Sequence, residues 1–73
     1  MLENVLINTI NGVKQDLLQE GRRIARLKKQ TTYCLIRGKN CGYVTTRPNI
    51  AELRIQQGYK LYAKYNKDGD LIV

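Results

Sequence analysis

Apolar residues recur at helical spacing over the first third of the chain. They stand three, four or seven positions apart, so that at 100° per residue they form one stripe about 100° wide. The residues of this stripe are Leu6, Ile10, Val13, Leu17, Ile24 and Leu27. The pattern predicts an amphipathic helix from Val13 to Glu20 that continues to Lys29.

Two glycines leave alternatives open within this segment. Asn11-Gly12 is a turn signal, so residues 4–10 are alternatively a short strand. Gly21 costs a helix about 1 kcal/mol relative to Ala and is a point where the helix can bend or end. The N-terminal decapeptide is therefore open between a helix, a strand and a free binding arm.

The hydrophobic period changes after this helix. Thr31–Ile36 is rich in β-branched and aromatic residues, and Tyr43–Thr46 repeats that character. Gly38-Lys39-Asn40 between them is turn-like. Residues 31–46 are therefore predicted to form a β-hairpin.

A short second helix is predicted after the hairpin. Asn49 is a good N-cap residue, and Glu52 three positions later can close a capping box. Ile50 and Leu53 supply its apolar contacts. Gly58 stands where a C-cap glycine is expected, and it ends the helix.

The cleanest alternation of apolar and polar residues follows Gly58. The predicted strand carries on one side Tyr59, Leu61, Ala63 and Tyr65, and on the other side Lys60, Tyr62 and Lys64. Asp68-Gly69 forms a turn, after which Leu71–Val73 returns as a short strand. The order α-β-β-α-β-β predicts one α+β domain over residues 1–73 with a small antiparallel sheet.

Composition excludes several classes of protein. The 73 residues are 42% apolar and 26% charged, which is a globular composition. A chain of this length buries about 60% of its unfolded surface, which leaves little room for an enclosed pocket. Histidine is absent and the six acids are scattered, so we expect no catalytic residues and no small-molecule substrate.

Membrane attachment is likewise not expected. No run approaches the roughly 20 apolar residues that span a bilayer. Residues 1–10 lack the basic start and long apolar segment of a signal peptide. We therefore expect a cytoplasmic protein.

The two cysteines, Cys34 and Cys41, lie in the predicted hairpin. Without histidine they cannot furnish the four nitrogen or sulfur ligands of a closed zinc site. They stand on the two arms without facing each other, so we expect buried, apolar thiols rather than a disulfide. No metal and no cofactor are expected.

The net charge of +7 is unevenly distributed. Residues 22–67 hold twelve Lys or Arg against one acid, Glu52, whereas the segments before and after them are each net negative. A segment of one sign raises the local potential and attracts polyanions. The pattern is therefore typical of a protein that binds an acidic partner.

The most basic stretch is RRIARLKKQ, at residues 22–30, which contains no acid. Its cations are Arg22, Arg23, Arg26, Lys28 and Lys29. On a helix the arginines share a face opposite Ile24 and Leu27, which we expect to dock on the sheet. The planar guanidinium forms bidentate bonds to both phosphate and carboxylate. This face is the first candidate binding site.

A second basic region lies on the predicted sheet. Its residues are Arg37, Lys39, Lys60, Tyr62 and Lys64. Tyrosine beside lysine suits single-stranded nucleic acid, with about 1–3 kcal/mol per stacked base. We expect Tyr62 to be exposed for such contact, and Tyr59 and Tyr65 to lie in the core.

The basic stretch resembles the arginine-rich motif with which some phage antiterminators bind an RNA hairpin. In size, basicity and lack of catalytic groups the chain is also similar to small phage-encoded regulators that bind host RNA polymerase. The resemblance implies a transcription regulator in the cytoplasm of a bacterial host, which acts on initiation or termination through contact with polymerase. The alternatives are a DNA- or RNA-binding protein without polymerase contact, and an inhibitor of another host factor.

Overall fold

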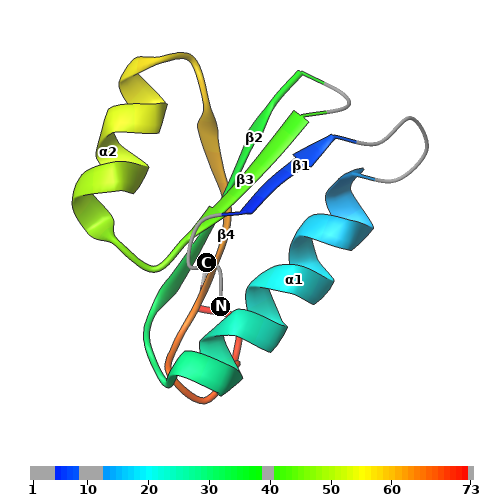
Figure 1. Cartoon of the computed structure of the whole chain (residues 1–73), viewed down its shortest axis with the longest axis vertical. Helices are drawn as coiled ribbons and strands as arrows, with labels where there is room; N and C mark the ends of the chain where they lie inside the picture. The colour runs from blue at the N-terminus through cyan, green and yellow to red at the C-terminus, as the bar shows by residue number, and fades with distance from the viewer. Residues whose placement is uncertain (1–4, 9–12, 39–40, 73) are drawn as a thin grey trace.

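The computed structural model describes residues 5–8, 13–38 and 41–72. These residues form helices and strands of an α+β domain, as predicted (Figure 1). The elements in chain order are β1 (Val5–Asn8), α1 (Val13–Lys28), β2 (Thr32–Arg37), β3 (Cys41–Thr45), α2 (Pro48–Gln56) and β4 (Lys60–Tyr65).

The described strands form one antiparallel sheet in the order β1-β3-β2-β4. β2 and β3 are the predicted hairpin, in which Cys34 lies opposite Val44. β1 pairs with β3 at the edge of the sheet, so the strand alternative for the N-terminal segment is confirmed. Leu6 accordingly lies in a strand and not in the helical stripe, while Ile10 lies outside the described residues.

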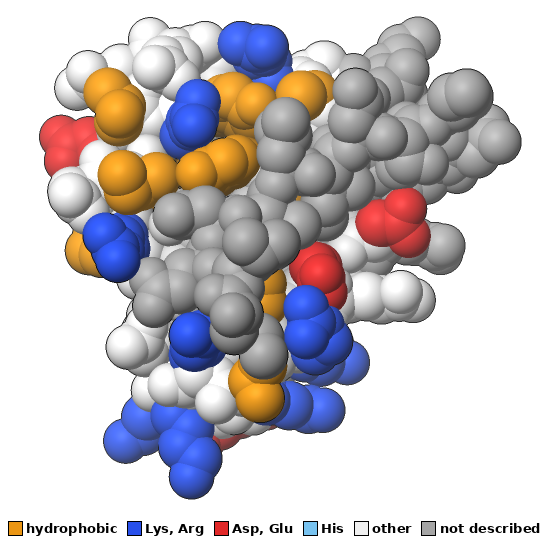
Figure 2. All heavy atoms as spheres, in the orientation of Figure 1, with side chains coloured by type: hydrophobic (Ala, Val, Ile, Leu, Met, Phe, Trp, Pro, Cys, Tyr) orange, Lys and Arg blue, Asp and Glu red, His pale blue; other side chains and the backbone are white. Residues whose placement is uncertain are grey.

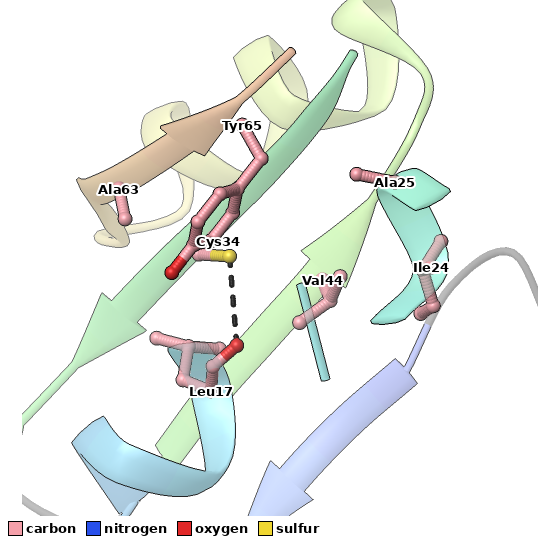
Figure 3. Packing of buried hydrophobic residues seen from close by; sticks show 7 residues of the cluster. All are labelled: Leu17, Ile24, Ala25, Cys34, Val44, Ala63 and Tyr65. Carbon is pink, nitrogen blue, oxygen red and sulfur yellow. Dashed lines mark hydrogen bonds between the residues drawn. The ribbon is translucent and has the colours of Figure 1, made fainter. Parts of the chain in front are cut away.

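The two helices cover opposite faces of the sheet (Figure 1). On the α1 side the buried cluster consists of Leu17, Ile24, Ala25, Cys34, Val44, Ala63 and Tyr65 (Figure 3). On the α2 side it consists of Leu35, Tyr43, Ala51 and Tyr59. Side chains alternate across a strand, so one strand can supply both clusters. Strand β2 contributes Cys34 to the α1 side and Leu35 to the α2 side, and β3 contributes Val44 and Tyr43 in the same way. The sheet is therefore the middle of three layers.

Helix α1 spans Val13–Lys28 without a break at Gly21. Leu17 and Ile24 are fully buried, as predicted. Leu27 is 52% exposed, so the prediction that it docks on the sheet is wrong. Ala25 is fully buried at that end of the helix instead, because the buried stripe follows the i, i+4, i+7, i+8 positions that start at Leu17.

Helix α2 begins at Pro48 rather than after an Asn49 cap. Arg47 is the N-cap residue and makes no side-chain cap bond, while its backbone N–H donates to Thr45 Oγ1 over 3.1 Å. Proline at the first helical position has its φ fixed near the helical value, which explains the earlier start. The predicted capping box of Asn49 is therefore wrong. Leu53, predicted to pack inward, is 46% exposed.

The end of α2 is the predicted glycine cap. Gly58 has a φ of 104°, a conformation that strains any residue with a Cβ. Its N–H donates to Ile55 O over 3.1 Å, and the N–H of Tyr59 donates to Arg54 O over 3.0 Å. These two bonds constitute a Schellman motif, which satisfies the last carbonyls of the helix.

Strand β4 contains a β-bulge that the alternation of its sequence conceals. Ala63 lies opposite Cys34, but Leu61 lies opposite the next residue of β2, so Tyr62 is an extra residue. Because of this extra residue, odd-numbered side chains before the bulge and odd-numbered side chains after it point to opposite faces of the sheet. Tyr59 and Tyr65 are both buried, as predicted, but they belong to the clusters on opposite faces.

The bulge also separates the two lysines of β4. Lys60 lies opposite Ile36, which packs on the α1 side, whereas Lys64 lies opposite Tyr33, which packs on the α2 side. The prediction that Lys60, Tyr62 and Lys64 line one face is therefore wrong.

The chain after β4 returns only briefly to the sheet. Leu71 forms an isolated bridge with Tyr65, and the N–H of Ile72 donates to Lys64 O over 2.8 Å. The predicted last strand is thus a single bridge, and Val73 lies outside the described residues.

Candidate partner-binding surface

An open groove of about 790 Å³ lies along the flank of α1, next to Tyr65 of β4. It is lined by Leu18, Gln19, Arg22, Arg23, Arg26, Leu27 and Tyr65, which we call the arginine groove. Its three arginines are exposed and lie within two turns of one helix. Leu18, Leu27 and Tyr65 give the same groove an apolar part. The groove therefore combines cationic and apolar side chains on a rigid element.

Arg22 is held over an aromatic ring. Its guanidinium carbon lies 5.6 Å from the ring centroid of Tyr65, which is 1% exposed. This cation–π contact orients the guanidinium but uses none of its N–H donors.

Arg23 is paired with an acid. Its Nε donates to Glu20 Oε1 over 2.6 Å and its Nη2 to Glu20 Oε2 over 3.0 Å. The bond from Arg23 lowers the pKa of the Glu20 carboxyl. The basic stretch itself contains no acid, but Glu20, two positions before it in the sequence, lies next to Arg23. Arg23 is therefore partly compensated before any partner binds.

The remaining cations of the basic stretch gather at the end of α1. A pocket of about 400 Å³ is lined by Arg26, Lys29, Lys67 and Asp68, and we call it the lysine pocket. Blue side chains are concentrated at this lower end of the molecule in Figure 2, below the last turn of α1. Lys28 is half-buried and does not line this pocket. Sequence reasoning missed Lys67, because only the fold brings the turn after β4 next to α1.

The second basic region does not assemble as predicted. Arg37 lies 5.0 Å from the Tyr59 ring centroid and donates to Gln57 O over 3.5 Å, on the α2 side. Lys60 and Lys64 lie on opposite faces, and Lys39 lies outside the described residues. Tyr62 is 38% exposed, in agreement with its predicted exposure.

Cations cover the rings of the other tyrosines. Lys64 Nζ lies 5.3 Å from the Tyr33 centroid, and the Arg54 guanidinium lies 4.4 Å from that of Tyr43. Tyr59 and Tyr65 are covered in the same way, by Arg37 and Arg22. Each of these four rings thus carries one of the chain's own cations.

Sequence reasoning also missed Arg54. Its Nη1 donates to Gln57 Oε1 over 2.9 Å, and its Nε is buried with no hydrogen-bond partner among the described residues. Its place over the Tyr43 ring follows from the packing of α2 against β3. No local pattern in the sequence distinguishes it from the other arginines.

The cysteines lie in different clusters, and both are free thiols. Cys34 is buried and its thiol donates to Leu17 O over 3.6 Å (Figure 3). Burial raises the pKa of this thiol to about 12. Cys41 is half-buried, with its Sγ 3.5 Å from the Tyr59 hydroxyl oxygen. The prediction of a buried, apolar thiol is thus right for Cys34 and partly right for Cys41.

The described residues contain neither a metal-binding cluster nor a membrane-spanning helix. Within residues 5–8, 13–38 and 41–72, no three residues among Cys, Asp and Glu gather in a way that could hold a metal ion. No helix in this part of the chain is long and apolar enough to cross a bilayer.

Comparison of the chain with protein-family models, curated proteins and solved structures finds no match.

Proposed function

We propose that the chain is a non-enzymatic transcription regulator, which binds an acidic and partly apolar surface of bacterial RNA polymerase through the arginine groove. The observation that carries this proposal is the joint presence of three exposed arginines and an apolar lining in one groove. The choice of polymerase as the partner rests on the resemblance to small phage-encoded regulators.

The apolar part of the groove favours a protein over a polynucleotide as its occupant. Leu27 leaves 52% of its surface exposed beside the arginines, where it can serve as an anchor. A carboxylate-bearing protein segment can satisfy guanidinium groups and cover leucine side chains at once. A phosphate backbone offers no apolar counterpart to Leu18 and Leu27.

The tyrosines that carry a cation over the ring also favour a protein partner over a polynucleotide. Single-strand binding by stacking requires ring faces that are open to bases. Tyr33, Tyr43, Tyr59 and Tyr65 each carry a cation over the ring instead. Direct nucleic-acid binding without polymerase contact therefore has less support in this surface than protein binding has.

A pull-down of the tagged protein from bacterial lysate tests this function. It is carried out with and without nuclease and at two salt concentrations. We expect stoichiometric polymerase subunits that remain after nuclease treatment and at moderate salt, because apolar contacts contribute to the binding. Recovery of nucleic acid alone, with loss on raising the salt, would overturn the proposal.

A further inference from the structure

The lysine pocket is a second cationic site, separate from the main part of the arginine groove. Three of its lining residues are cations and one is an acid, Asp68. Arg26 and Lys29 come from the end of α1, whereas Lys67 comes from the turn after β4. Two distant segments of the chain thus bring like charges together. Asp68 offsets one of the three positive charges, and the lining keeps a net charge of +2 that can attract an anion.

The backbone at Lys29 is unusual for a lysine. Its φ is 54°, in the left-handed region, and every other described residue with a positive φ is a glycine. Lys29 follows the last residue of α1, and the N–H of Gln30 donates to Ala25 O over 3.3 Å. Glycine or asparagine is the usual residue at this position of a helix end. The backbone alone therefore does not explain a lysine here.

Arg26 is fixed by contact with the turn. A Cβ at Gly69 would lie 2.5 Å from Arg26 Nε and 2.6 Å from its Cγ, so the arginine stem occupies the space of a side chain. The turn itself is closed by Asn66, whose Oδ1 accepts bonds of 2.9 Å from the N–H groups of Asp68 and Asp70. The stem of Arg26 and the backbone of the turn are therefore held in place before a ligand binds.

We propose that the lysine pocket binds the phosphodiester backbone of nucleic acid. Its lining contains no apolar and no aromatic residue, which suits a phosphate and leaves no means to stack a base. Helices that bind a membrane surface usually combine basic with apolar side chains, and this lining has no apolar side chain. Contacts of this kind position a protein on nucleic acid without reading its sequence.

The inference does not depend on the partner of the arginine groove. Lys29 and Lys67 line the lysine pocket and are absent from the groove lining, so they test the pocket alone. Arg26 lines both sites and is left unchanged in the test. If the pocket and the groove are occupied together, the protein contacts nucleic acid next to its protein partner.

The test is a fluorescence-anisotropy titration of a short labelled duplex DNA with the purified protein over a range of salt. We expect Lys29→Gly and Lys67→Gln each to weaken binding about tenfold near 0.1 M salt. Each should also reduce the log–log salt slope by about 1. Lys29→Arg, which keeps the cation, should restore most of the affinity.

The matched control is Lys60→Gln. It removes the same charge from an exposed residue of β4 that does not line the pocket, and it should leave the salt slope unchanged. Equal losses in all three variants would overturn the site in favour of diffuse attraction. Binding to vesicles of anionic phospholipid, but not to duplex, would overturn the assignment to nucleic acid. Failure to capture polymerase from lysate would leave this titration unaffected.

Discussion

Gly21 of α1 lies against Cys34 of β2 so closely that no side chain fits between them. A Cβ at position 21 would overlap Cys34 Sγ and would lie 3.3 Å from two ring carbons of Tyr65. The close approach lets the thiol of Cys34 reach Leu17 O, one helical turn earlier. Gly21 is therefore required for packing, which is why it neither bends nor ends the helix.

The first prediction concerns Gly21→Ala. Alanine favours a helix by about 1 kcal/mol over glycine, but an added methyl group in a filled core costs about 1–3 kcal/mol. The overlap with Cys34 puts the cost at the upper end of this range, so we expect the free energy of unfolding to fall by about 1–2 kcal/mol in total. Urea unfolding of wild type and variant measures this difference.

Cys34→Ala provides the control for this contact, because it removes the sulfur that the new methyl group meets. The Gly21→Ala/Cys34→Ala variant should lose less free energy of unfolding than the sum of the losses in the two single variants. Strictly additive losses would contradict the contact.

The second prediction concerns the thiol of Cys34. Burial raises its pKa from the ordinary value of 9.0 to about 12, so between these values the folded state keeps a proton that the unfolded state releases. Stability is therefore full below pH 9 and falls as the pH rises toward 12, by up to about 1.4 kcal/mol per pH unit. Urea unfolding of wild type and Cys34→Ala over this range isolates the effect. An identical pH dependence in both proteins would contradict it.

The third prediction concerns the helix end at Lys29. Lys29→Gly should raise the free energy of unfolding by about 1 kcal/mol, because glycine adopts a positive φ without strain. The matched control is Lys28→Gly in the preceding helical position, where glycine should cost about 1 kcal/mol. Thermal and urea unfolding give both values. A loss of stability in Lys29→Gly would show that the lysine side chain itself stabilises the helix end.

The fourth prediction concerns the ion pair in the arginine groove. Glu20→Gln removes the carboxylate that Arg23 binds, so we expect tighter binding of an acidic partner. Asp16→Asn makes the same change of charge on an exposed residue of α1 and serves as the control. Isothermal titration with the partner should show a larger gain for Glu20→Gln than for Asp16→Asn. Equal gains would indicate that only net charge matters.

Local patterns in the sequence predict most of the elements. The hairpin follows from β-branched residues around Gly38, and the end of α2 follows from Gly58, because each depends on a few neighbouring residues. The helix from Val13 follows from its apolar period. The strand at Val5–Asn8 is one of three alternatives for the N-terminal segment, beside a helix and a free binding arm, since four residues are too few to establish a period.

The errors arise where tertiary packing overrides the local pattern. The sequence of β4 alternates without interruption, but helices on both sides of the sheet allow apolar residues on either face. The bulge at Tyr62 can therefore reverse the pattern and separate Lys60 from Lys64. The sequence predicts that the arginines of α1 share one local face, and Arg22, Arg23 and Arg26 do line one groove. Glu20 as a partner of Arg23, Lys67 beside Lys29, and Arg54 over Tyr43 depend on side-chain geometry or distant contacts.

The most direct measurement is the affinity of purified RNA polymerase for the immobilised protein and for its Arg22→Glu/Arg23→Glu variant. The control is Lys60→Glu/Lys64→Glu, which reverses the same number of charges away from the arginine groove. Circular dichroism first establishes that both variants are folded. We expect the arginine variant to bind at least about tenfold more weakly than the control, which corresponds to 1.4 kcal/mol or more. Polymerase binding that is unchanged in the arginine variant, or equally weakened in both, would contradict the assignment of the groove.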